Sequence, residues 1–515
     1  MSDSLDVRLI SRSVGSAIST LTLSARRTIC LLLAVAIVGL AAGAANAGEF
    51  HGTATKFERD QCFILDRLPA DSGAQYKSKD TDQEQKLCKA DFRDKNVGLC
   101  PKTWSTSPGT IVYDISQSKY AGKPDVFENE FCPAQRRLKD SVPGVQKIAS
   151  YKQSINGQFN QRTSATFSQA SPLYYHFSRY LNATVDVPVA VMRTMAAQDH
   201  YRRVTTRAKT LVTTGMIANG WTVVNSAEKN PAGYVPTSEF YYGNPGDGLI
   251  YGMMAKGPGT RYGPEFNGNI AGKGYTDEYT FWQKTPAFLA LASRSDLSAA
   301  IDSALTASRS DPVVARALGR DVSHEQMVLW MKEMSDIFVL DYIFNQQDRP
   351  GNVDYLWVWY YVDADNQVKT AKVDSEASRS RMDGIALPAN IKSSPRHFLM
   401  QKTQLGDNDA GGRRYTNFTK KFGLLEKEHH MSATTYRQVI KLARDYQAKG
   451  PLYNYLRNTF NLSQNYVDNI AQNTIDAANI LKTTCKSGAM KFDLDPDSYI
   501  ATGKASDAHL DCENP

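Results

Sequence analysis

The sequence predicts an α+β protein with a small sheet-containing lobe and a larger helical lobe. At 515 residues the chain is longer than one hydrophobic core usually supports, so we expect two or three lobes. Short β-like runs alternate with amphipathic helices from about residue 145, and residues 432–483 have mostly helical periodicity. Strands that come early and helices that come late are typical of the α+β class.

The expected elements follow from the spacing of apolar residues. Short apolar or β-branched runs predict strands, and apolar residues that recur every three or four positions predict helices. In chain order we expect a helix over 171–182, a strand over 185–195, a helix over 196–216, a buried strand within 248–259, helices over 294–309 and 323–345, a strand over 355–362 and mostly helices over 432–483. The Gly-, Pro- and Tyr-rich stretch 229–275 is either a long surface loop or a lid over a substrate or nucleotide.

The first 47 residues have the pattern of a secretory signal. Arg26 and Arg27 precede an apolar run that ends in Ala45-Asn46-Ala47, which fits a small-residue cleavage site. We therefore interpret residues 1–47 as a signal peptide and expect an exported protein, periplasmic or extracellular, with no membrane segment after cleavage. A retained membrane anchor is the alternative, because the apolar run is long enough to span a bilayer.

Composition and charge are those of a soluble globular protein. The chain is 42% hydrophobic and 22% charged, and its 60 basic and 53 acidic residues give a formal net charge of +7. It contains no run of basic residues and no aromatic RNA-binding motif, so we expect no nucleic-acid partner.

The cysteines agree with export. Beyond the signal the chain has an even number of them, at Cys62, Cys88, Cys100, Cys132, Cys485 and Cys512. An even count in an exported protein indicates disulfides. The clustering predicts two bridges within residues 62–132 and one between Cys485 and Cys512, although the connectivity is not fixed by sequence. A zinc site is the alternative, but no C-x-x-C pair supports it.

The segment "DYIFNQQDRPGN", residues 341–352, places Asp348, Arg349 and Asn352 on a tight bend between a predicted helix and a predicted strand. Phosphoryl transfer requires a carboxylate that orients the attacking hydroxyl, and oxygen ligands for the divalent ion that bridges the phosphates. Asp348, Asn352 and Asp374 have the order that such a site needs. Asp, Pro, Gly and Asn are also turn formers, so spacing alone fits a simple turn equally well.

Two segments resemble FAM20-type secretory-pathway kinases and their bacterial exported relatives. Residues 341–352 followed by "KVDSE" (372–376) are similar to the catalytic and metal-binding segments of that family. The stretch "YYHFSRYLNATVDVPVAVMRT" (174–194) is similar to its helix-to-strand segment, and "LIYGMMA" (249–255) to its hinge. The resemblance covers roughly residues 145–480 and implies a bilobal atypical protein-kinase-like fold.

The resemblance also implies a division of the chain. We expect the signal peptide to be followed by a disulfide-containing N-terminal extension (48–145), a kinase-like N-lobe (146–260), a kinase-like C-lobe (261–484) and a disulfide-tied C-terminal tail (485–515).

The family's roles fall on particular residues here. Asp348 would be the catalytic base, Asn352 and Asp374 the metal ligands, and Asp341 and Arg349 supports of the loop. The implied cofactors are ATP and Mg²⁺ or Mn²⁺. The implied reaction transfers a phosphoryl group to a hydroxyl of an exported protein, glycan or small molecule.

The predicted strand "IASYKQS" (148–154) offers Lys152 as the phosphate-contacting lysine, with Lys147 as second choice. In kinases a glutamate from the following helix normally holds this lysine. This chain has no glutamate between Glu130 and Glu228, and the family's position falls near Ser171.

Lys152 therefore needs Asp186, Asp199 or a more distant carboxylate as its partner. The Asp348–Asn352 spacing is also shorter than is common, and Asp-Ser-Glu stands where a D-N-G-like triplet is expected. These departures keep two alternatives open: a catalytically inactive kinase-like binding or regulatory module, and a nucleotidyl-transferase. A carboxylate within reach of Lys152 would favour the phosphotransferase.

Overall fold

The computed structural model describes residues 50–515 except 139–141, 156–163, 235, 258, 269–272, 320–321, 374–384 and 414. The chain divides into two units, residues 1–47 and 48–515, and the structure described below belongs to the second. The predicted signal peptide lies outside the described residues, and so does Asp374.

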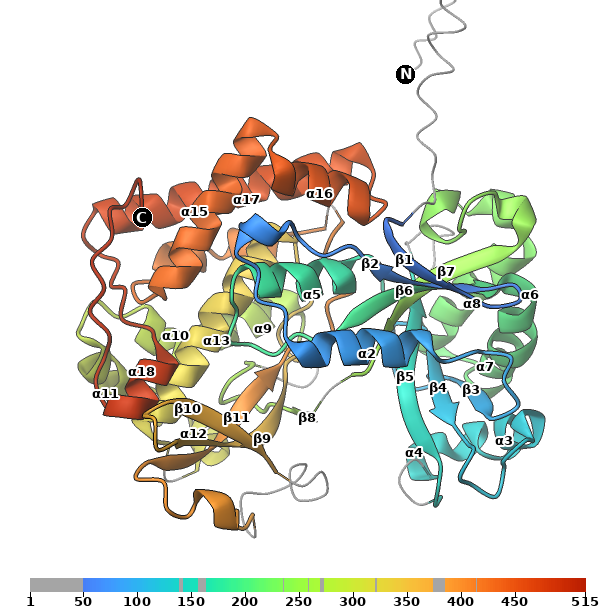
Figure 1. The fold of residues 1–515 in the computed structure, drawn as a ribbon, viewed down its shortest axis with the longest axis horizontal. Helices are drawn as coiled ribbons and strands as arrows, with labels where there is room; N and C mark the ends of the chain where they lie inside the picture. The colour runs from blue at the N-terminus through green and yellow to red at the C-terminus, as the bar shows by residue number, and fades with distance from the viewer. Residues whose placement is uncertain are drawn as a thin grey trace, which may run out of the picture. The chain divides into compact units, whose positions relative to one another are not determined.

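A seven-stranded antiparallel sheet forms one part of this unit (Figure 1). Its strand order is β1-β2-β6-β7-β5-β4-β3. The strands are β1 (Gly52–Lys56), β2 (Gln61–Leu65), β3 (Val97–Pro101), β4 (Thr110–Asp114), β5 (Gln146–Gln153), β6 (Ala190–Ala196) and β7 (Leu249–Ala255).

The segment expected to be a separate extension is an integral part of this sheet. β4 pairs with β5 and β2 pairs with β6, so strands from residues 48–145 flank the strands that follow on both sides.

Close packing at the centre of the sheet depends on Gly252 of β7. A Cβ at this position would lie 2.3 Å from the carbonyl oxygen of Lys152, so a larger residue would push β7 away from β5.

A second antiparallel sheet lies in the later part of the chain. Its central strand is β9 (Asp354–Val362), which pairs with β10 (Val368–Lys372), β11 (His397–Gln404) and the two-residue β8 (Thr260–Arg261).

The helix α13 (His324–Ile343) is buried all round. Ser323 caps it, because its hydroxyl accepts a hydrogen bond from the backbone N–H of Gln326. Every side chain from Gln326 to Ile343 is buried. The charged Lys332 and Asp336 within this stretch pair with each other, as buried charges require. α13 packs against α10 (Pro286–Leu291), α17 (Gln464–Lys486), α18 (Pro496–Thr502) and β11, and it ends at the bend that carries Asp348.

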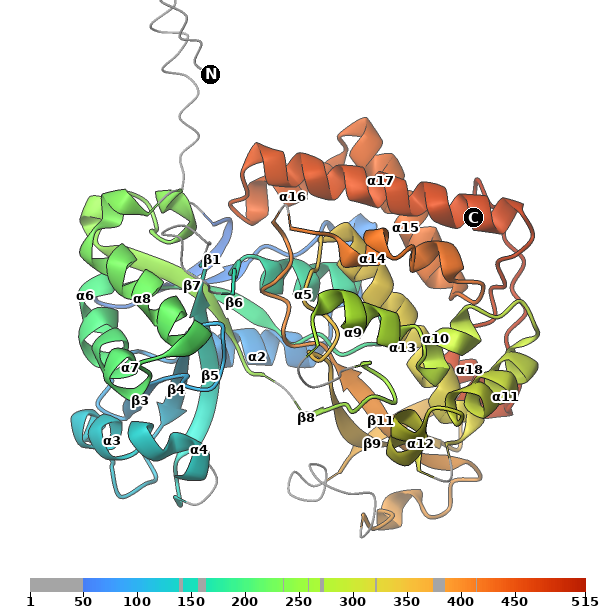
Figure 2. The ribbon, with the colours of Figure 1, turned by 180° about the vertical axis from the view of Figure 1, so that it is seen from behind.

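The remaining helices surround these elements (Figures 1 and 2). They are α2 (Ser78–Cys88), α3 (Pro124–Glu130), α4 (Gln135–Leu138), α5 (Ala170–Tyr180), α6 (Ala197–His200), α7 (Thr206–Leu211), α8 (Gly215–Lys229), α9 (Tyr275–Trp282), α10 (Pro286–Leu291), α11 (Leu297–Ser308), α12 (Pro312–Leu318), α14 (Phe418–Lys421), α15 (Ala433–Ala448), α16 (Pro451–Thr459), α17 (Gln464–Lys486) and α18 (Pro496–Thr502). α2 and α5 pack on the seven-stranded sheet at β6, and α3 packs at β3.

The mixed α and β content is confirmed, but strands are not confined to the early part of the chain, because the second sheet is built mainly from residues 354–404. Among the described residues, no helix is both long and apolar enough to cross a membrane. The predicted disulfides are also confirmed: Cys62–Cys88, Cys100–Cys132 and Cys485–Cys512. The first joins β2 to the end of α2, and the last holds the C-terminal tail against the end of α17. Disulfides are typical of exported proteins.

The Cys62–Cys88 bridge should contribute measurably to stability. A bridge that closes a loop of this size restricts the unfolded chain, so Cys62→Ser with Cys88→Ser should lower the free energy of unfolding by about 3 kcal/mol in urea titrations. Fully reduced wild-type protein is the control and should lose at least as much. An unchanged urea midpoint would contradict the expectation.

Candidate functional site

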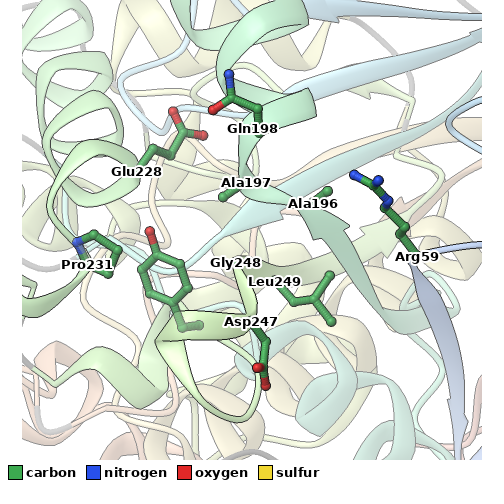
Figure 3. Close-up of a pocket in the computed structure, with 10 residues that line it drawn as sticks. Arg59, Ala196, Ala197, Gln198, Glu228, Pro231, Asp247, Gly248 and Leu249 are labelled. Carbon is green, nitrogen blue, oxygen red and sulfur yellow. The ribbon is translucent and has the colours of Figure 1, made fainter.

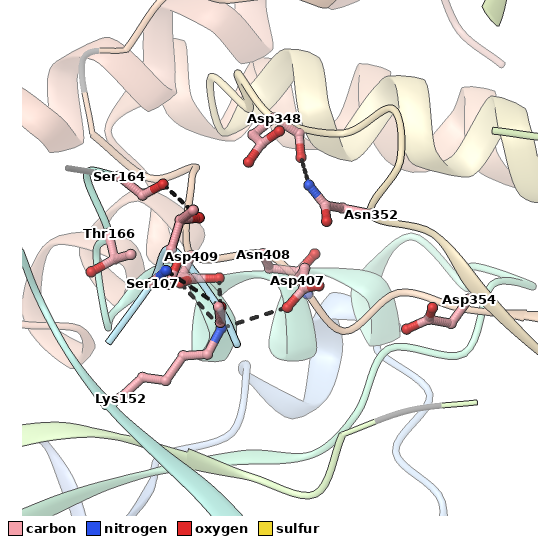
Figure 4. Close-up of polar contacts among 12 residues, drawn as sticks. Ser107, Lys152, Ser164, Thr166, Asp348, Asn352, Asp354, Asp407, Asn408 and Asp409 are labelled. Atoms are coloured by element: carbon pink, nitrogen blue, oxygen red, sulfur yellow. Dashed lines mark hydrogen bonds and ion pairs between the residues drawn. The ribbon is translucent and has the colours of Figure 1, made fainter. Parts of the chain in front are cut away.

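The predicted site residues must share one location if they are to act together. The structure has a cavity of about 480 Å³ at the ends of β6 and β7, but none of the predicted site residues lines it (Figure 3). A different, strongly polar cavity is lined by Asp348 and Asn352, together with Asp407 and Asp409 (Figure 4). We call it the acidic cavity.

A buried ion pair shapes the bend that carries Asp348. Arg349 donates to both carboxylate oxygens of Asp341, with each donor–acceptor distance 2.8 Å, and both side chains are fully buried. The hydroxyl of Tyr174 from α5 donates to the same carboxylate at 2.7 Å. Arg349 also donates to the carbonyl of Asp407 and to the side-chain oxygen of Asn408. Asp341 and Arg349 thus support the loop, as expected from the sequence.

Asp348 lies half-buried on the cavity wall. Its backbone carbonyl accepts a hydrogen bond from the side chain of Asn352 at 2.9 Å, which fixes the two residues on one turn. Burial raises the pKa of Asp348 to about 6, and the nearby carboxylates of Asp407 and Asp409 add to the shift. A carboxyl group with this pKa can exchange a proton near neutral pH.

Lys152 of β5 pairs with two aspartates that line this cavity. Its Nζ lies 3.2 Å from Asp409 and 3.5 Å from Asp407, and its side chain is only 6% exposed. Burial alone would lower the pKa of Lys152, but the two carboxylates outweigh it and the pKa is raised. The lysine is therefore charged and paired.

The other carboxylates considered for Lys152 lie elsewhere. Asp186 accepts a hydrogen bond from Gln404, and Asp199 pairs with Arg93. At the start of α5, where a glutamate was sought, Gln169 donates to the hydroxyl of Tyr251. Lys147, the second choice, has an exposed side chain.

Asp407 and Asp409 were missed by the sequence interpretation. They belong to "GDNDAGG", residues 406–412, which directly follows β11. Asp407-Asn408-Asp409 is closer to the expected D-N-G-like triplet than the Asp-Ser-Glu that begins at Asp374, and this similarity was the available signal.

Arg261 of β8 connects the two halves of the cavity wall. Its guanidinium donates to the side-chain oxygen of Asn352 at 2.9 Å, pairs with Asp354 at 2.9 Å and pairs with Asp407 at 3.1 Å. Burial by itself raises the pKa of Asp407, but Lys152, Lys102 and Arg261 together lower it well below its usual range. Asp407 therefore remains anionic while Asp348 titrates.

Oxygen atoms suited to a hard divalent cation gather here. The described residues contain no cluster of three or more His, Cys, Asp or Glu that could hold a metal by itself. Mg²⁺ is, however, usually bound by one or two carboxylates together with substrate phosphates and water. Asp407, Asp409 and the amide oxygen of Asn352 meet that smaller requirement.

Hydroxyl groups complete the rim of the acidic cavity. Ser105, Thr106 and Ser107 come from the connection between β3 and β4, and Ser164 approaches from the segment before α5. The hydroxyl of Ser164 donates to that of Thr106 at 2.9 Å. The rim thus presents neutral donors next to charged groups.

No protein-family model matches this chain, and no curated protein matches it either.

The Asp341–Arg349 pair should be costly to break. Asp341→Ala leaves a fully buried guanidinium without its carboxylate, which typically costs about 3–5 kcal/mol. Thermal unfolding should therefore occur at a clearly lower temperature. Asp476→Ala, which breaks the exposed pair with Lys420, is the control and should cost about 0–1 kcal/mol. Equal effects of the two substitutions would contradict the assigned role.

Asp348 should lower stability at neutral and alkaline pH. Its pKa is raised to about 6 in the folded protein from an ordinary value of 3.8, so ionisation favours the unfolded chain, and the penalty is complete above pH 6. Asp348→Asn should therefore be more stable than wild type by about 1–2 kcal/mol at pH 8, and the difference should shrink below pH 6 and vanish below about pH 3. Urea titrations at several pH values measure this difference. A gain that does not depend on pH would refute this explanation.

Proposed function

We propose that this protein is an exported phosphotransferase that uses ATP and Mg²⁺ or Mn²⁺ to phosphorylate a hydroxyl of a protein, glycan or small molecule. The supporting observation is that three separate segments meet at one cavity: Asp348 and Asn352 line it from the bend, Asp407 and Asp409 line it from the loop after β11, and Lys152 of β5 pairs with both of these aspartates. These are the parts that phosphoryl transfer requires: a lysine for the phosphates, oxygen ligands for the metal and a carboxylate for the acceptor hydroxyl.

The proposed fold is the bilobal atypical kinase-like fold of FAM20-type kinases. Its N-lobe would be built on the seven-stranded sheet, in which β5 carries the lysine and is followed by α5. Its C-lobe would be built around α13, the bend at Asp348 and the loop after β11. The order of lysine strand, base-bearing bend and metal-binding loop along the chain is that of protein kinases.

Each residue has a role in the proposed reaction. Asp407 and Asn352 would hold the divalent ion, which neutralises charge on the phosphates when bound. Lys152 contacts the phosphates, and Asp409 orients Lys152 in place of the missing glutamate. Asp348 orients the acceptor hydroxyl and takes its proton.

The charge around the cavity suits a polyphosphate. Burial lowers the pKa of Lys102 to about 8, and the adjacent positive charge of Lys152 adds to the shift. The ammonium groups of Lys102 and Lys152 thus repel one another here, and a bound triphosphate would relieve that repulsion.

The pairing of Lys152 favours an enzyme over an inactive kinase-like module. An unpaired lysine was the main reason to consider such a module, and Asp409 supplies the missing carboxylate. In this proposal Asp407 takes the metal-binding role that the sequence assigned to Asp374.

The test separates binding from chemistry. The protein without residues 1–47 is mixed with ATP, with and without Mn²⁺, and its melting temperature and phosphoryl transfer are measured. ATP with Mn²⁺ should raise the melting temperature, because a ligand that binds only the folded state stabilises it. Asp407→Asn should abolish this rise, whereas Asp348→Asn should keep it and slow transfer about 100-fold or more.

Two further variants make the result specific. Asp365→Asn removes an exposed carboxylate on the β9–β10 turn and should change neither quantity. Asp374→Asn tests the original assignment: if it abolishes the rise and Asp407→Asn does not, the metal ligand is Asp374. No rise with any nucleotide and metal would refute the proposed function.

A further inference from the structure

A third cavity is lined by the second sheet, by α13 and by the starts of α15 and α18. Its volume of about 480 Å³ lies in the range of small-molecule pockets. None of its lining residues lines the acidic cavity. We call it the lysine cavity, because the charged residues of its lining are Lys77, Lys332, Lys369, Lys402, Asp495 and Asp497.

Lys402 reaches this cavity from the packed face of the second sheet. In the register of β11 against β9, Met400 is the partner of Val358 and Lys402 is the partner of Leu356, so these side chains share one face. Met400 and Val358 pack with Leu329 of α13 in a small hydrophobic core. A lysine beside such a core keeps its ammonium group in contact with water or with an anion. The cavity gives Lys402 that access.

Two of the cavity's lysines have no carboxylate to pair with. Lys332 pairs with Asp336, and Lys369 pairs with Asp363 at 3.7 Å. Within the described part of the chain, no carboxylate lies at ion-pair distance from Lys77 or Lys402. Partial burial lowers the pKa of Lys77 to about 8, and the positive charge of Lys402 adds to the shift. The two ammonium groups are therefore close enough to repel each other.

The aspartates near these lysines are engaged elsewhere or stand off from them. The carboxylate of Asp495 accepts a hydrogen bond from the backbone N–H of Ser498 at 3.0 Å and so caps α18. Asp186 accepts a hydrogen bond from Gln404. Asp497 is exposed, and Lys402 lowers its pKa without forming an ion pair with it. Lys402 and Lys77 thus keep ammonium groups that can donate to a further anion.

The start of α15 adds to the preference for an anion. Ser432 is the residue before the first turn of α15 (Ala433–Ala448), and it lines the cavity together with Thr434. Among the described residues, the Ser432 side chain caps none of the free backbone N–H groups of that turn. The first N–H groups of a helix lack partners within the helix, and the helix dipole favours negative charge beside them. The helix start therefore reinforces the effect of the lysines.

We propose that the lysine cavity binds a phosphate group, either as free phosphate or as part of a small phosphate ester. The phosphate oxygens would accept hydrogen bonds from the ammonium groups of Lys77 and Lys402 and relieve the repulsion between them. A phosphate monoester carries nearly two negative charges at neutral pH, because its second pKa is about 6. Two ammonium groups match that charge, and charge-assisted hydrogen bonds are stronger than neutral ones. This site is independent of the phosphotransferase proposal, because it shares no lining residue with the acidic cavity.

The test uses simple probes. Inorganic phosphate, glucose 6-phosphate, glucose and acetate are titrated separately at pH 7.5 and constant ionic strength into the protein without residues 1–47, by calorimetry and by thermal unfolding. At least one of the two phosphate compounds should bind and raise the melting temperature, whereas glucose and acetate should bind at least about tenfold more weakly. Tighter binding of glucose 6-phosphate than of inorganic phosphate identifies the ligand as an ester, and the reverse order identifies it as free phosphate.

Three variants make the result specific. Lys402→Gln removes one ammonium group and should weaken phosphate binding about tenfold or more. Lys372→Gln makes the same charge change at an exposed position of β10 that does not line the cavity, and it should leave binding unchanged. Thr370→Trp keeps both lysines but fills the cavity beside Tyr360, so it should abolish binding, and it decides the question if Lys402→Gln does not fold.

Phosphate held at the acidic cavity would not respond to either cavity variant. The proposal is overturned if neither phosphate compound binds wild type, if glucose or acetate binds equally well, or if binding survives Lys402→Gln or Thr370→Trp in a folded protein.

Discussion

The buried ion pair between Asp341 and Arg349 joins the segments that build the acidic cavity. Asp341 lies in the last turn of α13, receives a hydrogen bond from Tyr174 of α5, and binds Arg349 on the bend beyond the helix. Arg349 then reaches the backbone of Asp407 and the side chain of Asn408. Buried charges persist only where each is paired and hydrogen-bonded. Separating the bend from the loop after β11 would therefore leave two donors of the buried Arg349 guanidinium without acceptors.

This scaffold places two aspartates in one cavity and shifts their pKa values in opposite directions. Lys152 and Arg261 approach Asp407 closely and lower its pKa, whereas burial and the neighbouring acids raise the pKa of Asp348 to about 6. Carboxyl groups whose pKa values are pushed apart can divide the work of a reaction between them. In the proposed phosphotransferase, Asp407 stays anionic for a cation and Asp348 can take a proton.

Much of the fold could be predicted from local sequence patterns, but the long-range pairing of segments could not. The apolar spacing located α13 and β9, and the clustering of cysteines gave the disulfides, because each signal lies within a short stretch. The joining of β4 to β5, which merges residues 48–145 with the sheet, depends on pairing that periodicity does not encode. The partner of Lys152 was sought on the next helix, yet Asp409 is 257 residues away in sequence. Asp348, Asn352 and Lys152 could be singled out because each lies within a local motif, whereas their proximity depends on Asp407 and Asp409 of the loop after β11.

Strand β5 is linked through its bonding partners to the acidic cavity and to the cavity at the ends of β6 and β7. Successive residues of a strand point to opposite faces. Lys152 faces Asp407 and Asp409, and Gln153 donates instead to His200, which holds Glu228. β5 is hydrogen-bonded to β4 on one side and β7 on the other, so it cannot shift far as a unit. Coupling between the cavities would therefore consist of small changes in hydrogen bonding and charge around His200. Because coupling between two ligands is reciprocal, any ligand of the cavity at the ends of β6 and β7 that altered nucleotide affinity through this path would have its own affinity altered by the same factor.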